Sequence, residues 1–265
     1  MSGDISPNSH RVGDYYDRVI DETCRLLGGQ SGQFHVGFFD KRDDILPEAQ
    51  LRLNDRLAQA MNVRRGARVV DIGCGIAGPA CYLASKYDWN ITGVTISQVQ
   101  SRQAEDVITE YGCSERVRVI VGDAHNLPLE NERFDAVYGI ESFAHFSDKF
   151  KVIGECARLT RTGGILGIWD LVACSREVSG AFELLHLITI EEYKEICQQH
   201  GFEIISADDF GQAILPRSMD AFIEMLDPVA NSTTIRTCHE IHDKFRTGEV
   251  GYALIVTRRP GAASA

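Results

Sequence analysis

Apolar runs of strand length alternate along the chain with stretches of helical periodicity. The first run begins at Arg68 and leads into the turn Gly73-Cys74-Gly75, and further runs lie at 90–94, 116–121, 134–140, 165–170, 202–207 and 252–257. Between them, the spacing of apolar residues predicts helices over 77–87, from the N-cap Ser97 to 111, over 148–160, and over 190–200, ending at Gly201. Such alternation indicates βαβ units and a parallel sheet.

Two segments do not fit the alternation. An amphipathic helix is expected over 13–27, followed by a glycine-rich break, an aromatic loop at 34–40 and a helix over 47–61. Within the alternating part, a turn at 162–164 is expected before the strand at 165–170. Residues 1–65 are therefore predicted to form a helical N-terminal cap, and residues 66–265 the core. The stretch 216–246 is mostly helical and too long for an ordinary connection, which predicts a lid or substrate wall inserted in the core.

Composition narrows the class of protein. The 265 residues are 44% apolar and 25% charged, as in a single globular α/β domain. The net charge of −11 argues against nucleic acid and anionic membranes as partners, because the field of the protein repels both. The first ten residues are mostly polar and contain no apolar core of a signal peptide, and no apolar run approaches the length of a membrane span. Eight cysteines without a C-x-x-C pair indicate free thiols, hence a cytoplasmic protein.

The glycine turn carries the first indication of a ligand. Gly73, Gly75 and Gly78 match the dinucleotide pattern G-x-G-x-x-G, which is weak evidence alone. Asp71 precedes the turn and would repel a pyrophosphate, whereas it would attract an ammonium group. The following strand leads into Thr95-Ile96-Ser97, which provides hydroxyls but no carboxylate for a dinucleotide ribose. The turn therefore suits S-adenosylmethionine (SAM) better than NAD.

Five motifs in order support this interpretation. They are Val70-Asp71-Ile72-Gly73-Cys74-Gly75, Gly93-Val94-Thr95-Ile96-Ser97 with Gln100, Gly122-Asp123-Ala124-His125-Asn126-Leu127-Pro128, Phe134-Asp135-Ala136-Val137 and Arg161-Thr162-Gly163-Gly164. With them the chain resembles the class I SAM-dependent methyltransferases, in particular the small-molecule branch that includes sugar, sterol, tocopherol and antibiotic-pathway enzymes. The resemblance implies a Rossmann-like α/β fold, with a seven-stranded, mostly parallel sheet whose last strand is antiparallel.

The resemblance also implies how SAM would be held. Asp71 and the backbone of Gly73, Cys74 and Gly75 would face its methionine end, and Thr95, Ile96, Ser97 and Gln100 its ribose. Asp123 and the Ala124 backbone would face the adenine, Tyr16 and His35 the sulfonium, and Glu141 would line the pocket. Other interpretations remain open: Asp71 and Asp123 as turn residues, Gln100 as a solvated helix residue, Tyr16 as a packed aromatic side chain and His35 as a loop histidine.

Methyl transfer to a hydroxyl benefits from a general base. In methyltransferases that act on oxygen or carbon, a segment similar to Glu141-Ser142-Phe143-Ala144-His145 places a histidine beside the methyl group, so His145 is the candidate base. Asp170, expected at the end of its strand, would orient that histidine or bind a substrate hydroxyl. The alternatives are a loop histidine that caps the next helix and a solvated acid. We do not expect His186, His239 and His242 to form a metal site. Candidate apolar walls are Phe38, Phe39, Phe143, Phe146, Phe182, Leu185, Phe222 and Met225.

These features together predict a SAM-dependent methyltransferase. Its acceptor would be a small, partly apolar metabolite of a secondary pathway, methylated at a hydroxyl oxygen with His145 as base. The alternatives are C- or N-methylation, or a SAM-bound cyclase that transfers no methyl group. The expected partner is the small-molecule acceptor, without metal, nucleic acid or membrane, and a homodimer is left open.

Overall fold

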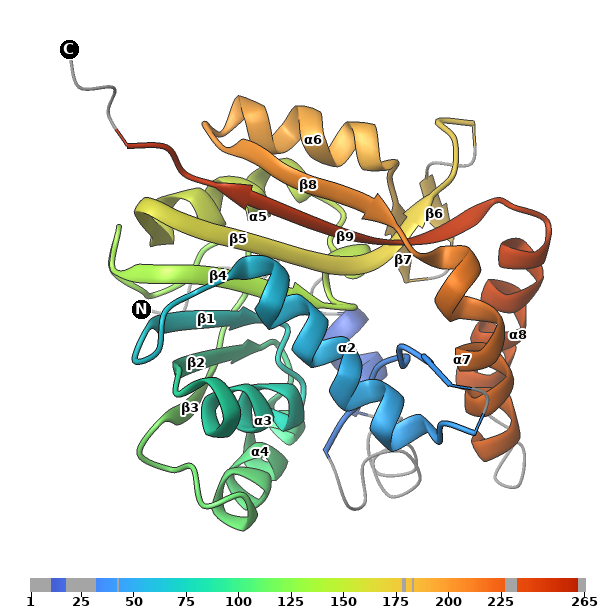
Figure 1. Cartoon of the computed structure of the whole chain (residues 1–265), viewed down its shortest axis with the longest axis horizontal. Coiled ribbons are helices and arrows are strands. Elements are labelled where there is room, and N and C mark those ends of the chain that lie inside the picture. Colours follow the sequence, from blue (N-terminus) through green and yellow to red (C-terminus); the bar gives the residue numbers. More distant parts are fainter. Residues whose placement is uncertain are drawn as a thin grey trace.

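A seven-stranded sheet forms the centre of the computed structural model, which describes residues 11–17, 32–41, 43–177, 180–182, 184–226 and 233–261 (Figure 1). Its order is β3-β2-β1-β4-β5-β9-β8. Only β9 runs antiparallel to the other six strands, so the predicted fold class is confirmed. The strands are β1 (Arg68–Ile72), β2 (Asn90–Thr95), β3 (Val117–Val121), β4 (Phe134–Ile140), β5 (Thr160–Ala173), β8 (Glu203–Asp209) and β9 (Val250–Arg258).

Helices cover both faces of the sheet, which explains why the residues of its central strands are buried on both faces rather than on alternate positions. One face carries α2 (Leu46–Met61), α3 (Gly78–Tyr87) and α4 (Gln98–Glu110), and the other carries α5 (Lys149–Leu159) and α6 (Ile190–Gln199) (Figure 1). Consecutive residues of β1 separate accordingly, because Val69 packs in the first core and Val70 in the second. The helices predicted in these regions are confirmed, with Ser97 as the N-cap of α4.

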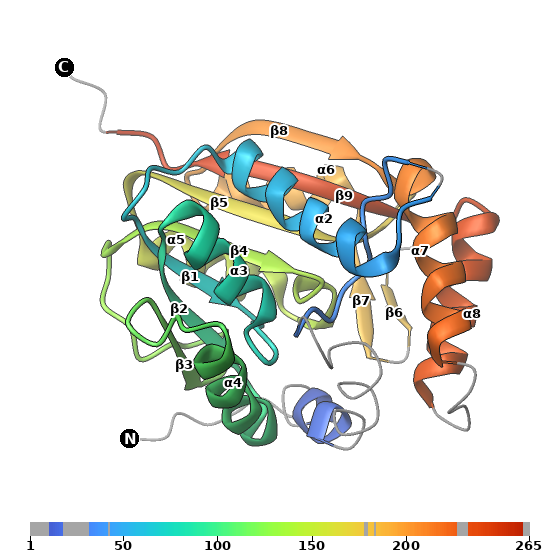
Figure 2. The same ribbon diagram turned by 60° about the horizontal axis from the view of Figure 1, so that its bottom comes forward.

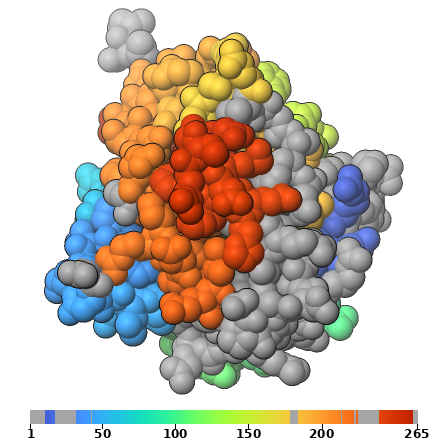
Figure 3. All heavy atoms as spheres, turned by 90° about the vertical axis from the view of Figure 1, so that its right-hand side faces the viewer, coloured from blue at the N-terminus to red at the C-terminus, as the bar shows by residue number. Residues whose placement is uncertain are grey.

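The helical insertion packs against the N-terminal part of the chain. It consists of α7 (Gly211–Leu226) and α8 (Thr233–Arg246), which lie side by side at one end of the molecule (Figure 3). The Ser218 hydroxyl in α7 donates to the Gly37 carbonyl at 2.8 Å, which connects α7 to the loop before α2. The predicted start at Pro216 was wrong, because α7 already begins at Gly211 and contains the proline in its interior.

The long strand β5 departs from the prediction at both ends. The predicted turn at 162–164 lies within the strand, where pairing with β4 jumps from Phe134↔Thr160 to Ala136↔Ile165 and Gly163 has φ +75°. At the other end, β5 continues three residues beyond Asp170, because β9 pairs with it as far as Ala173. β5 therefore extends beyond the end of β4, and Asp170 lies one residue past the last residue of β5 that pairs with β4.

Two smaller elements complete the described chain. Residues 11–17 are helical and lie next to α4 (Figure 2), while the rest of the helix expected over 13–27 lies outside the described residues. A hairpin of β6 (Gly180–Phe182) and β7 (Leu185–Leu187) follows β5. Within the described part of the chain, we find no helix with the length and apolar character needed to cross a bilayer. The division into cap and core stays a prediction.

Candidate cofactor and active site

A cavity of about 1020 Å³, including the space at its mouth, opens at the carboxyl ends of β1, β2 and β4. The strand order reverses between β1 and β4, and ligands of open α/β sheets bind in the crevice at such a point. Most of the singled-out residues line this cavity: Tyr16, His35, Asp71, Gly73, Cys74, Gly75, Thr95, Ile96, Gln100, Asp123, Ala124, Glu141 and His145. Ser97 and Asp170 do not line it. The role of each residue remains a prediction.

The glycine turn brings its backbone close to the cavity. Gly73 has φ +77°, and a Cβ added there would lie 2.4 Å from the Cβ of Ser142. The N–H groups of Gly73 and Cys74 both donate to the Val94 carbonyl at 2.9 Å, which fixes the turn against β2. At Gly75, φ is +54° and an added Cβ would have its nearest neighbour, a Gln100 nitrogen, 4.0 Å away. Gly75 is thus the turn residue with open space in front of it.

Asp71 is a buried carboxylate with little to offset its charge. Its side chain is at the end of β1, the residue is 3% exposed, and Oδ2 accepts from the Tyr138 hydroxyl at 2.9 Å. Burial raises the pKa of Asp71 to about 7. The described residues that line the cavity include two further acids, Asp123 and Glu141, and no lysine or arginine. A cationic ligand would therefore be stabilised in this cavity.

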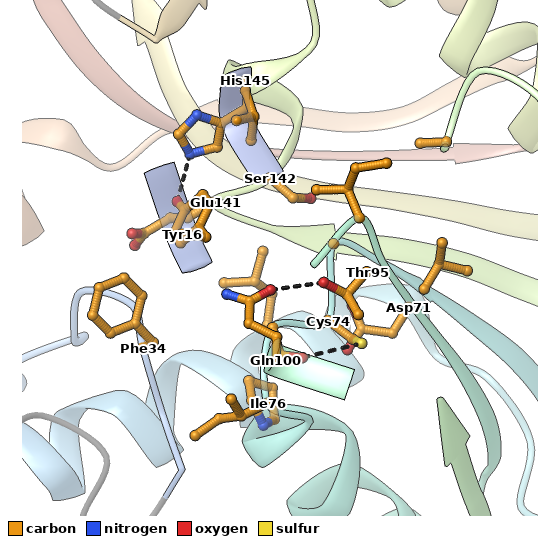
Figure 4. A pocket seen from close by; sticks show the side chains of 18 of the residues that line it. Tyr16, Phe34, Asp71, Cys74, Ile76, Thr95, Gln100, Glu141, Ser142 and His145 are labelled. Carbon is orange, nitrogen blue, oxygen red and sulfur yellow. Dashed lines mark hydrogen bonds between the residues drawn. The ribbon is translucent and has the colours of Figure 1, made fainter. Parts of the chain in front are cut away.

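The end of β2 presents an amide rather than a carboxylate. The Thr95 hydroxyl donates to Gln100 Oε1 at 2.7 Å, so the amide nitrogen of Gln100 is left on the cavity side (Figure 4). Ser97 is turned away: its hydroxyl accepts from the Gln100 N–H at 2.9 Å and donates to Asp17 of the helix 11–17. The position of Ser97 supports a capping and tethering role instead of the predicted ribose contact.

At the end of β3, Asp123 is held by a neighbour that sequence reasoning passed over. His125 donates its backbone N–H to Asp123 Oδ1 at 3.0 Å, and its ring Nδ1 lies 2.5 Å from the same oxygen. The histidine lies in the motif that contains Asp123, but nothing in its spacing indicated this contact. The Asp123 carboxylate is thereby oriented at the cavity wall beside Ala124.

His145 lies where its unprotonated nitrogen faces the cavity. It ends the short 3-10 helix η2 (Phe143–His145), and its ring Nδ1 lies 3.2 Å from the Leu184 carbonyl while Nε2 lies 2.8 Å from the Tyr16 hydroxyl (Figure 4). A carbonyl oxygen only accepts, so Nδ1 carries the hydrogen and Nε2 accepts from Tyr16. Burial lowers the pKa of His145 to about 4 and raises that of Tyr16 well above its usual range, so both are neutral near pH 7.

Glu141 joins the aromatic loop to the sheet, and the ring of His35 forms its contacts within the same stretch of chain as that loop. Glu141 has φ +50°, and its Oε1 accepts from the Val36 N–H and the Tyr252 hydroxyl, both at 2.8 Å. Burial raises the pKa of Glu141 to about 8. The ring of His35 contacts the Val36 carbonyl at 2.7 Å through Nδ1, and burial lowers the pKa of this histidine to about 4. Both side chains line the cavity and are also fixed by the loop.

The Asp170 carboxylate accepts hydrogen bonds from backbone N–H groups and does not line the cavity. Asp170 is 1% exposed, and its carboxylate accepts from the N–H of Ala144 at 3.0 Å and of Leu171 at 2.7 Å. Burial raises its pKa to about 6. The expected position at the end of β5 was wrong, and the contacts support positioning of η2 rather than direct contact with substrate.

The expected apolar walls are mostly elsewhere. Of that set, Phe146 lines the cavity, whereas Phe38, Phe143 and Leu185 are buried in the cores and the side chains of Phe182, Phe222 and Met225 lie outside the described residues. No described residue of α7 or α8 lines this cavity, so the insertion as a substrate wall stays a prediction. Lining residues that sequence reasoning did not single out include Val12, Phe34, Ile76, Pro79 and Ser142. Nor do the described residues contain a group of three or more His, Cys, Asp or Glu side chains suited to a metal ion.

Comparison with known proteins decides the family. Residues 4–227 match the family model of mycolic acid cyclopropane synthetase. The chain belongs to this family. Its members are SAM-dependent methyltransferases, so the predicted class of enzyme and its cofactor are confirmed.

Individual relatives extend over nearly the whole chain. The 27-O-demethylrifamycin SV methyltransferase of Amycolatopsis mediterranei is 29% identical, covering 96% of this chain and 98% of its own. The O-methyltransferase cnsE of Penicillium expansum is 31% identical over 79% of this chain and 78% of its own. Among solved structures, the [4+2]-cyclase SpnF is similar with a TM-score of 0.88 and 29% identity, covering 98% of this chain and 100% of that chain.

Proposed function

We propose that this methyltransferase transfers the methyl group of SAM to a hydroxyl oxygen of a small, partly apolar metabolite of a secondary pathway, with His145 as general base. The observation that carries the proposal is the hydrogen bond from the Tyr16 hydroxyl to Nε2 of His145. A substrate hydroxyl that takes the place of the tyrosine hydroxyl would meet the same unprotonated nitrogen. The hydroxyl proton would pass to Nε2 while the oxygen takes up the methyl group that SAM would supply, with S-adenosylhomocysteine as the leaving group.

The charges of the cavity support SAM as the ligand. SAM supplies a methyl carbon activated by a positive sulfur, and it also carries an ammonium group. Asp71 is the candidate partner of the ammonium, because its buried carboxylate has one described hydrogen-bond donor, Tyr138. The amide of Gln100, with Thr95 and Ile96, would face the ribose, and Asp123 with the Ala124 backbone would face the adenine. The enzyme's own part is to align the two reactants and exclude water.

The relatives favour oxygen over nitrogen or carbon as the acceptor atom. The rifamycin enzyme and cnsE are both named for methyl transfer at oxygen, and each is about as similar to this chain as the cyclase is. The acceptor identity stays open within the class of hydroxyl-bearing metabolites. We further propose a cytoplasmic location, which the free thiols of six cysteines support: Cys74, Cys81, Cys113, Cys156, Cys174 and Cys197. A mass measurement in solution would decide between a monomer and a homodimer.

A second candidate function rests on one observation. The high similarity to the [4+2]-cyclase SpnF favours a cyclase that keeps the fold and transfers no methyl group. The two candidates differ in stoichiometry, because methyl transfer releases one S-adenosylhomocysteine for each product and cyclisation releases none.

The test is an incubation with deuteromethyl-labelled SAM and a panel of phenols, macrocyclic alcohols, amines and polyenes. We expect S-adenosylhomocysteine in equal amount to a product labelled at oxygen, measured by mass spectrometry and NMR. Label at nitrogen or carbon would contradict the O-methyl assignment. A product isomeric with its substrate, formed without S-adenosylhomocysteine, would contradict methyl transfer and support the cyclase.

A further inference from the structure

A buried lysine lies behind the candidate base. Lys149 is the first residue of α5, is 5% exposed and does not line the cavity. Its Nζ donates to the Phe146 carbonyl at 2.9 Å and to the His186 carbonyl. These carbonyls belong to two different segments, the loop after η2 and the strand β7. The ammonium group therefore joins the residue that follows His145 to the β6–β7 hairpin.

The hairpin in turn orients the imidazole. Leu184, two residues before His186, provides the carbonyl that accepts from Nδ1 of His145. The hairpin is paired through three residue pairs only, Gly180↔Leu187, Ala181↔His186 and Phe182↔Leu185. A two-stranded hairpin of this size is not stable alone, so its position depends on contacts with the rest of the protein. The contact from Lys149 to His186 is such a contact, made next to the segment that orients His145.

Asp170 provides the opposite charge. Its carboxylate accepts from the backbone of Ala144, one residue before His145, and its negative charge favours the ammonium form of Lys149. Burial lowers the pKa of Lys149 to about 8, so the side chain still carries its charge near pH 7. The two buried charges fix the backbone of η2 from one side and the hairpin from the other.

We infer that Lys149 is a positioning residue for His145: through the hairpin it fixes the carbonyl of Leu184, and so determines that Nδ1 carries the hydrogen and Nε2 accepts. The inference rests on the proposed function, in which Nε2 of His145 is the base. A merely structural lysine would contribute to folding without affecting which nitrogen is protonated. The two roles can therefore be separated by a spectroscopic measurement.

The charged and titratable groups that bear on His145 come from several elements. Tyr16 faces it from the helix 11–17, Lys149 from α5 and His186 from β7, and the last two both lower the pKa of His145. Removal of the ammonium group at position 149 would therefore raise the pKa of His145. The acid limb of the pH–kcat profile would then move to higher pH.

The experiment compares Lys149→Met with Lys149→Arg and, as a matched control, Lys151→Met, an exposed lysine of the same helix. Long-range proton–nitrogen NMR of the full-length protein reports the protonated nitrogen of each histidine. His145→Gln identifies the signals of His145 among those of the eight histidines. In the native protein and Lys151→Met we expect Nδ1 to be protonated, whereas Lys149→Met should give a mixture of tautomers and Lys149→Arg should restore the native pattern.

Kinetics provide the second readout. Lys149→Met should lower kcat about 10- to 100-fold, the range found when the partners that orient metal-binding histidines are removed, with the KM for SAM within about twofold. An unchanged tautomer in folded Lys149→Met would overturn the inference, whether or not kcat changes. If Lys149→Met does not fold, a mixed tautomer in folded Lys149→Arg would overturn it and a native one would support it. Full activity of His145→Gln would refute the proposed function alone, because the NMR result does not depend on activity.

Discussion

Replacement of Asp71 by asparagine should stabilise the ligand-free protein and weaken SAM binding at the same time. The carboxylate is buried at the end of β1 and has one described hydrogen-bond donor, Tyr138. Burial raises the pKa of Asp71 from 3.8 to about 7. At 1.36 kcal/mol for each unit, this rise corresponds to about 4 kcal/mol that the ionised form costs the folded state, an upper limit because the site relaxes.

The sign follows from proton linkage. An acid with a raised pKa in the folded state binds more protons when folded, so its contribution to stability decreases as the pH rises from about 4 to about 7. Asparagine has nearly the same shape as a protonated aspartate and does not ionise. The advantage of Asp71→Asn should therefore be about 1 kcal/mol or less at pH 5 and about 2 to 3 kcal/mol at pH 8, equivalent to roughly 4 to 8 °C in Tm.

The assay is thermal unfolding at pH 5 and pH 8, with titration calorimetry of SAM at pH 8. Asp208→Asn is the control, since Asp208 is an exposed carboxylate of β8. The loss of a charged partner for the ammonium group should weaken SAM binding at least about tenfold. An Asp71→Asn protein that is destabilised at pH 8, or that binds SAM as tightly as the native protein, would refute the reasoning.

Two further predictions concern the turn and the cap. Gly73→Ala should destabilise the protein by at least about 3 kcal/mol in urea unfolding, because φ is +77° and the new Cβ would overlap Ser142. The control Gly66→Ala, where φ is +70° but the space is open, should cost about 1 kcal/mol. Equal costs for the two variants would contradict the overlap with Ser142. Ser97→Ala should lower the free energy of unfolding by about 1 kcal/mol, because α4 loses its N-cap. It should also remove the contact with Asp17, which we expect to give faster proteolysis near the N-terminus. An unchanged free energy of unfolding would contradict the role of Ser97 as the N-cap.

The sequence predicted those parts of the fold that depend on local pattern. Mainly apolar runs and the glycine turn located β1, β2 and β4, and the ends of these strands placed Asp71, Thr95 and Glu141 around one cavity. Strand ends set by a distant partner could not be predicted in this way. The end of β5 depends on pairing with β9, which lies more than 70 residues later in the chain. The sequence therefore predicted that β5 ends at Asp170, whereas it ends at Ala173.

The direction of a polar side chain was equally hard to predict. Ser97 follows the same strand as Thr95, and only the start of α4 decides that its hydroxyl caps the helix instead of facing the cavity. Lys149 gave no signal at all, because a lysine at a helix start is normally solvated. Its burial results from the hairpin and the loop after η2, which meet only in the folded chain.

The central claim is tested most directly by kcat of the native protein and of His145→Gln with a hydroxyl acceptor from the panel, between pH 6 and pH 8. Because the pKa of His145 is about 4, the native imidazole is neutral throughout, and we expect this residue to cause no change in kcat over that range. His145→Gln should retain SAM binding and lose about 100-fold or more in kcat. A variant that keeps kcat within about threefold of the native value would contradict His145 as the base that accepts the hydroxyl proton.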